Sequence, residues 1–122
     1  MLYSIDTNTY IWTIPHQEDY DIWRSRISDN EYEAIVTELY RKIDSDQIHT
    51  LNGNPGQDWI DTVFEPIYEK ACRQDRTAAA KFFKLIFWSV LLEHREVWGF
   101  AHYNKDGMRL DGLTYFKLGN PP

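Results

Sequence analysis

The chain has 122 residues, of which 43% are hydrophobic and 26% charged, and this indicates one globular domain, residues 1–122, rather than a disordered chain. The formal net charge of −6 argues against nucleic-acid binding and against anionic membrane surfaces, because both kinds of partner are themselves negatively charged. Aromatic residues make up 16% of the chain, so some of them are expected to serve a contact surface rather than the core.

The cellular setting predicted from the sequence is a soluble, cytoplasmic one. The first fourteen residues have no basic start followed by a long apolar run, so no signal peptide is expected. No stretch reaches the ~18–20 apolar residues that a membrane span requires. Cys72 is the sole cysteine and is expected to be a small buried apolar residue, although Lys70 and Arg73 beside it could lower its pKa.

Residues 2–14 are rich in Ile, Thr, Tyr and Trp, which predicts a strand, either one long bent strand or a hairpin turning at residues 6–8. Residues 17–26 are ambiguous. Their acidic start and basic end favour a short helix with Ile22, Trp23 and Ile27 turned inward, and a strand is the alternative.

Residues 28–44 carry the clearest helix signal. Ser28 and Glu31 have the spacing of a capping box, in which each side chain bonds the other residue's backbone N–H. Apolar residues then recur at the spacing of one helix face, at Tyr32, Ile35, Val36, Leu39, Tyr40 and Ile43.

The middle of the chain is predicted to be a loop followed by helices. Residues 51–58 are rich in Asn, Gly and Pro, which is typical of a loop. A short helix over 58–64 and a second over 66–73 are expected, with one kinked helix as the alternative. Asp75 is placed to cap a helix over 77–94, which is apolar nearly all round and is therefore expected to be the central core helix.

Trp88 and Leu92 interrupt the polar strip of this central helix, which otherwise carries lysine, serine and arginine. Two explanations are open. Another segment of the same chain covers Trp88, or the two residues form a contact surface for a second copy or a different partner.

The last quarter of the chain is predicted to be a β-hairpin, since Asp106-Gly107 is the strongest short hairpin signal. A two-residue turn pairs His102 with Asp111 and Trp98 with Tyr115, unless a bulge at Gly112 shifts the later pairs by one.

The two faces of this hairpin differ, and neither is polar. One has a small-residue middle at Gly99, Ala101 and Gly112, a shallow trough in which the central helix is expected to lie. The other is an aromatic patch between two ion-pair candidates, Glu96–Lys117 and His102–Asp111. This patch and the exposed side of the central helix supply the predicted binding or interface residues: Trp88, Leu92, Trp98, Phe100, Leu113 and Tyr115.

Catalytic signals are weak. None of the four histidines has metal-ligand spacing, so neither a metal nor a cofactor is expected. His102 opposite Asp111 could orient an imidazole as a general base, which makes a small enzyme the alternative function, and a structural cross-strand pair accounts for the same two residues.

Taken together, the sequence predicts an α+β fold. A small antiparallel sheet, made of the C-terminal hairpin and the N-terminal strand or hairpin, packs against three to four helices. The predicted function is a non-catalytic binding or assembly protein, homodimeric, with an aromatic surface for a protein partner or a small aromatic or cationic ligand. An accessory protein of a phage or mobile element is a further alternative.

Overall fold

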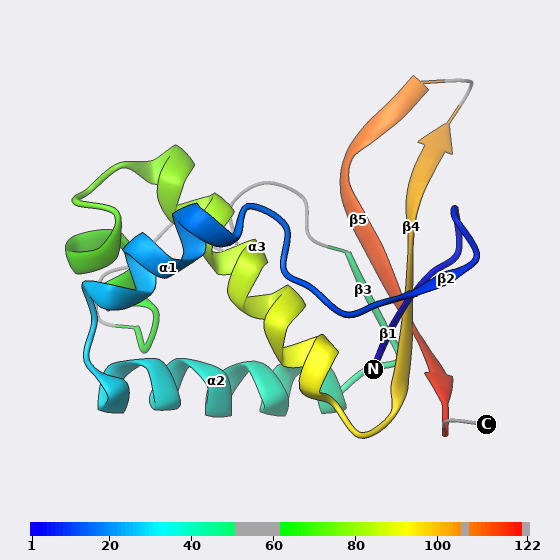
Figure 1. Ribbon diagram of the computed structural model, residues 1–122, viewed down its shortest axis with the longest axis horizontal. Helices are drawn as coiled ribbons and strands as arrows, with labels where there is room; N and C mark the ends of the chain where they lie inside the picture. The colour runs from blue at the N-terminus through cyan, green and yellow to red at the C-terminus, as the bar shows by residue number, and fades with distance from the viewer. Residues whose placement is uncertain (51–61, 106–107, 121–122) are drawn as a thin grey trace.

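The structure is a computed structural model that describes residues 1–50, 62–105 and 108–120, and the side chains of residues 1–49, 62–101 and 114–120. In Figure 1 the helices lie on one side and the sheet, seen nearly edge-on, lies on the other. This arrangement of helices on one face of a sheet confirms the predicted α+β class.

The sheet has five strands in the described part of the chain, in the order β2-β1-β4-β5-β3. Strand β1 pairs antiparallel with β2, which confirms the hairpin alternative for the N-terminus. It also pairs parallel with β4, so the sheet is mixed rather than antiparallel throughout as predicted. The β4–β5 and β5–β3 pairs are antiparallel. The bounds are β1 Leu2–Ser4, β2 Thr9–Ile11, β3 Ile48–Thr50, β4 Val97–Lys105 and β5 Met108–Gly119.

The helices follow the local signals closely. Helix α2 spans Asp29–Asp44 and begins with the predicted capping box between Ser28 and Glu31. Helix α3 spans Arg76–Glu93, and the side chain of Asp75 caps it by accepting from the Ala78 N–H. The other two are α1, Gln17–Ser25, and a short π-helix η1, Ile67–Ala71. The predicted helix over 58–64 lies largely outside the described residues.

Residues 17–26 were predicted as a helix or a strand, and the helix is correct, since α1 spans Gln17–Ser25. One residue of its predicted inward side is exposed. Trp23 packs on Phe82 of α3, and Ile27 is buried as expected. Ile22 is 51% exposed, so its predicted inward position was wrong. Lys81 on α3 bonds Asp19 at 2.9 Å, one helical turn before Trp23 and on the same side of α1.

The strands of the hairpin begin to pair where predicted, with Lys105 opposite Met108, but the register then slips. Between Asn104 and His102 the partner strand advances by four residues while β4 advances by two, so His102 faces Leu113 rather than Asp111. Trp98 accordingly faces Lys117 rather than Tyr115. A slip of two residues preserves the alternation of faces, so the two predicted faces survive.

Helix α3 packs on the opposite face of the hairpin from the one expected. The Trp88 ring lies 4.7 Å from the Phe100 ring, and the Phe87 ring lies 5.1 Å from the Tyr115 ring. The prediction of a helix in the Gly99 trough was wrong because burying large aromatic side chains removes far more apolar area from water than burying glycine and alanine.

The core lies between this aromatic face, α3 and α2. Helix α2 contributes Ile35, Leu39 and Ile43, none of which is exposed. Where α2, α3 and β4 meet, His94 closes the junction by bonding the Asp44 carboxylate through Nε2 at 2.8 Å. The helices and the core therefore occupy one side of the sheet, and its other side is left to solvent (Figure 1).

Candidate functional site

Three of the predicted interface residues are core residues of the chain itself. Trp98, Tyr115 and Phe100 are 1%, 2% and 7% exposed, under α3 and beside His49 and His94. Burial raises the pKa of the Tyr115 phenol, which fits a desolvated site. These three rings belong to the hydrophobic core, so they offer no free contact surface.

The residues of the central helix are also largely covered by their own chain. The indole N–H of Trp88 donates to the backbone carbonyl of Thr13 at 3.0 Å, and its ring lies on Phe100. Leu92 is half-buried and packs against the core. The segment after β2 therefore covers Trp88, which favours the first of the two explanations for this position.

The weak catalytic candidates His102 and Asp111, and the interface candidate Leu113, have side chains outside the described residues. Their backbone register is described, and it opposes His102 to Leu113. The cross-strand placement on which the proposed acid–base pair depended is therefore absent. At the other end of the aromatic face, the predicted Glu96–Lys117 ion pair is present at 3.1 Å.

The two histidines whose rings lie beside Trp98, His49 and His94, stabilise the fold. His94 is 5% exposed, its Nδ1 accepts from the Glu96 N–H, and its Nε2 therefore carries the proton shared with Asp44. His49 Nε2 lies within hydrogen-bond distance of the carbonyl oxygens of Ile43 and Asp46. No cluster of metal-ligating side chains occurs among the residues whose positions are described.

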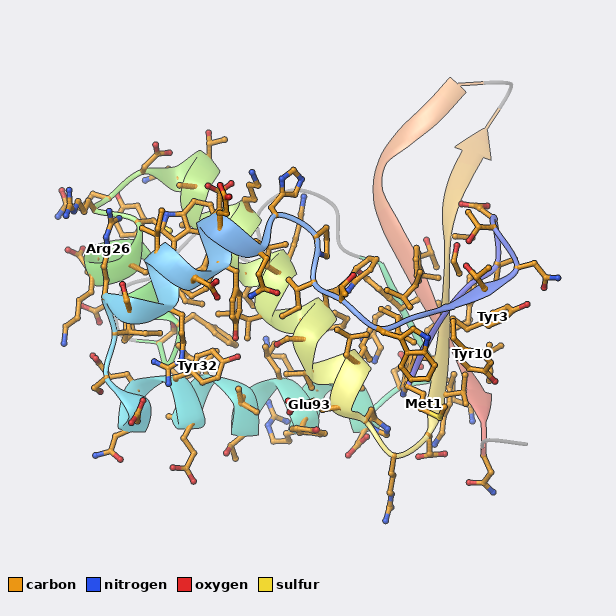
Figure 2. All side chains as sticks on the ribbon, in the orientation of Figure 1. Met1, Tyr3, Tyr10, Arg26, Tyr32 and Glu93 are labelled. Carbon is orange, nitrogen blue, oxygen red and sulfur yellow. The ribbon has the colours of Figure 1, made fainter. Side chains whose placement is uncertain are left out.

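The side of the sheet that faces away from the helices carries an apolar surface, which we call the outer face. Strand alternation and pairing place ten described residues on it: Tyr3, Ile5, Tyr10, Trp12, Ile48, Gly99, Ala101, Thr114, Phe116 and Leu118. None of the ten is charged. In Figure 2, Tyr3 and Tyr10 point from the sheet away from the helices.

An aromatic ladder runs along one half of the outer face. The ring centroids of Tyr3 and Tyr10 are 5.1 Å apart in an edge-on arrangement, and Tyr10 stacks on Trp12 at 5.9 Å. Such pairs are favourable beyond the area they bury and hold the rings in place. Trp12 ends the ladder with 73% of its surface exposed.

The middle of the outer face is flat because Gly99 has no side chain. A Cβ there would lie 2.9 Å from a methyl carbon of Leu118 and 3.2 Å from one of Ile5. These two aliphatic side chains lie over the glycine, and they remain 51% and 45% exposed. The trough predicted from the small residues is thus filled by aliphatic side chains that present a broad apolar surface.

A second feature lies on the helical side, where α1, α2, α3 and the segment before α1 enclose a pocket of about 380 Å³. Its wall combines aliphatic residues, a cluster of hydroxyls and two carboxylates: Ile14, Tyr20, Tyr32, Glu33, Val36, Ser89, Val90 and Glu93. Figure 2 shows Tyr32 on α2 and Glu93 near the end of α3.

The hydroxyls of the pocket form a hydrogen-bonded chain. Tyr20 Oη and Tyr32 Oη are 2.5 Å apart, and Tyr32 Oη is 3.5 Å from Ser89 Oγ. Ser89 itself donates to the Ile86 carbonyl at 2.7 Å. Burial, and then the bond with Tyr32, raise the pKa of the Tyr20 phenol, so it is neutral at physiological pH.

Sequence reasoning missed both features. The outer face was visible as one apolar side of the hairpin, but Ile5, Trp12 and Ile48 join it only through strand pairings between distant segments. The pocket has no local signal, because its hydroxyls come from Tyr20, Tyr32 and Ser89 on three helices.

No family model, curated protein or solved structure matches the chain. Among the described helices, none combines the length and the apolar character needed to cross a membrane.

Proposed function

We propose that the chain is a non-catalytic assembly protein that associates with a second copy of itself through the outer face of the sheet. The observation that carries this proposal is the location of the exposed apolar side chains. Five large hydrophobic residues of the described chain are exposed, and four of them, Ile5, Trp12, Ile48 and Leu118, belong to the outer face. A contiguous apolar patch of this kind is typical of an interaction site.

A second copy suits this surface because the ten described residues of the outer face carry no charge. A charged partner, whether basic, acidic or nucleic acid, would meet no opposite charge on these ten residues, whereas a two-fold symmetric contact needs only a self-complementary patch. Two sheets packed face to face at a separation of ~10 Å let their side chains interdigitate. The edge strands β2 and β3 are three residues long, which disfavours edge-to-edge pairing as the mode of association.

The size of the patch sets the expected affinity. Its exposed aromatic and aliphatic surface is on the order of several hundred Å² per copy. A standard stable interface buries about 800 Å² per partner, so this contact is at the low end. We therefore expect a reversible dimer with a dissociation constant on the order of micromolar.

Net charge gives this association a distinctive salt dependence. Each copy carries −6, so the two copies repel one another. Raising the ionic strength from about 0.01 M to about 0.15 M shortens the Debye length from ~30 Å to ~8 Å. Salt should therefore strengthen self-association, whereas it would weaken the binding of a basic partner.

Sedimentation equilibrium of the wild type from about 0.1 to 100 µM tests the proposal. The average mass should rise from 14.6 kDa toward twice that value. Leu118→Lys places a charge at the centre of the contact and should weaken the dimer at least tenfold. The change lowers the magnitude of the net charge, so added repulsion between copies cannot explain a loss.

Ile22→Lys on α1 is the matched control, since Ile22 and Leu118 are both 51% exposed and the substitution is the same. It should dimerise like the wild type. A wild type that stays at 14.6 kDa throughout the concentration range would refute self-association. A dimer that Leu118→Lys leaves intact would refute the outer face as its surface.

A further inference from the structure

The pocket between the helices lies on the opposite side of the molecule from the outer face, and its lining has a different chemistry. Ile14, Val36 and Val90 supply aliphatic wall, and a volume of about 380 Å³ is within the range of small-molecule sites. The pocket brings together residues from the segment before α1 and from three helices. A ligand there would therefore contact α1, α2 and α3 at once.

The carboxylates of the pocket are available to a ligand. Glu33 and Glu93 are both exposed, and within the described part of the chain neither makes an ion pair or a hydrogen bond. Elsewhere on the helices the described carboxylates are often paired, as Asp19 is with Lys81 and Glu31 with Lys70. Two unpaired negative charges beside an aliphatic wall create a site that favours a cation with an apolar body.

The hydroxyl chain adds a neutral acceptor. Ser89 uses its proton on the Ile86 carbonyl, so Tyr32 can donate to Ser89 and Tyr20 to Tyr32. In that direction the lone pairs of the Tyr20 oxygen receive no donor from this chain of hydroxyls. An ammonium group has only donors, and it matches an acceptor oxygen and two carboxylates.

The cation already near this site does not fill it. The Arg24 guanidinium lies 4.1 Å from the centre of the Tyr32 ring, but it is not among the residues that line the pocket. Its charge is paired with the Asp29 carboxylate at 2.7 Å, and it also donates to the Ile27 carbonyl. Arg24 therefore fixes the Tyr32 ring and leaves the charges of Glu33 and Glu93 uncompensated.

We propose that this pocket binds a small organic ammonium ion, with the ammonium group between Glu33, Glu93 and the Tyr20 oxygen and its apolar body against Val36 and Val90. This site is independent of the self-association proposed above, because none of its residues belongs to the outer face.

The test is a titration followed by ¹H–¹⁵N NMR, with 2-phenylethylammonium as the probe and 2-phenylethanol as its neutral counterpart. A ligand of about nine non-hydrogen atoms is expected to bind with a dissociation constant on the order of 0.1–10 mM. Amide shifts should concentrate at the lining residues of α1, α2 and α3. The alcohol should bind at least fivefold more weakly, because one charge pair at ~4 Å in water is worth about a fivefold change in affinity.

Three variants locate the site. Glu93→Gln should weaken binding of the ammonium about fivefold, and the double variant with Glu33→Gln should weaken it further, while neither affects the alcohol. Glu18→Gln makes the same change in net charge at an exposed position that does not line the pocket, and it should bind like the wild type. Val36→Phe fills the pocket from a half-buried position and should abolish binding of both probes.

Several results would overturn the proposal. Equal affinity for the alcohol and the ammonium ion would show an apolar cavity without the proposed recognition of charge. Equal losses in Glu18→Gln and Glu93→Gln would show attraction by net charge alone. Shifts away from the lining residues, or full binding by Val36→Phe, would place the site elsewhere.

Discussion

Trp98 distinguishes a core role from an interface role for the aromatic face of the hairpin. It is 1% exposed, with the rings of His49 and His94 at 5.5 Å and 6.0 Å. Truncating a buried Trp to Ala removes its transfer free energy and leaves a cavity, which together cost about 3–5 kcal/mol. A chain of this length is expected to have a free energy of unfolding of roughly 6–18 kcal/mol, so Trp98→Ala should remove a large part of it.

Removing the indole N–H offsets part of the cost of Trp98→Ala. Trp98 Nε1 is buried without a hydrogen-bond partner in the described structure, and an unsatisfied buried donor costs about 1–3 kcal/mol. Trp98→Phe keeps most of the ring and deletes this group. Its free energy of unfolding should therefore lie much closer to the wild type than that of Trp98→Ala.

The assay is urea unfolding followed by tryptophan fluorescence at about 0.05 µM protein, well below the expected dissociation constant, so that the dimer contributes little. Trp12→Ala is the control on the outer face, since Trp12 is 73% exposed, and it should change the free energy of unfolding by no more than about 0.5 kcal/mol. The reasoning is refuted if Trp98→Ala costs less than about 1 kcal/mol at an unchanged m-value. Equal losses for Trp98→Ala and Trp12→Ala would refute the assignment of the two faces.

Three further outcomes are expected. Ser28→Ala removes the capping box of α2 and should lower the free energy of unfolding by about 1 kcal/mol, measured from the urea midpoint. Ser45→Ala, just beyond the other end of α2, is the control and should cost less. Burial raises the pKa of the Cys72 thiol to about 12. Iodoacetamide at pH 8 should therefore label Cys72 in urea but not in the folded protein. Rapid labelling of the folded protein would contradict the burial of this thiol. The raised pKa values of Cys72 and Tyr20 mean that the folded state favours the protonated form of both groups. The stability that these two groups contribute is therefore complete below about pH 9 and declines as pH rises toward 12. A melting temperature that stays level from pH 8 to 11 would contradict this.

The starts of α2 and α3 were predictable because their causes are local. A capping box is made by Ser28 and Glu31, three residues apart, and the cap of α3 by Asp75 and Ala78. The pairing of Lys105 with Met108 is equally local, since the sequence signal for it lies in the two residues between them. Such features form wherever the neighbouring residues allow them, so composition, charge order and spacing suffice to identify them.

Local sequence patterns could not predict which distant segments pair as strands. Strand β3 is three residues long, too short to show a period, and exists because Ile48 and its neighbours pair with β5. Likewise, β1 runs parallel to β4, so Tyr3 lies beside Gly99 although 95 intervening residues separate them in sequence. These pairings complete the outer face, which is why the sequence showed only the part of it that lies on the hairpin.

The sequence by itself determined the α+β class, the starts of α2 and α3, the pairing of Lys105 with Met108 and the presence of two apolar sheet faces, all through interactions between residues a few positions apart. Only the tertiary structure decided which face α3 covers. Alternation alone treats the two faces as equivalent, whereas packing favours the one where Trp98, Phe100 and Tyr115 remove the most apolar area from water. The face left over, with Trp12 and Leu118 exposed, became the candidate surface for that same energetic reason.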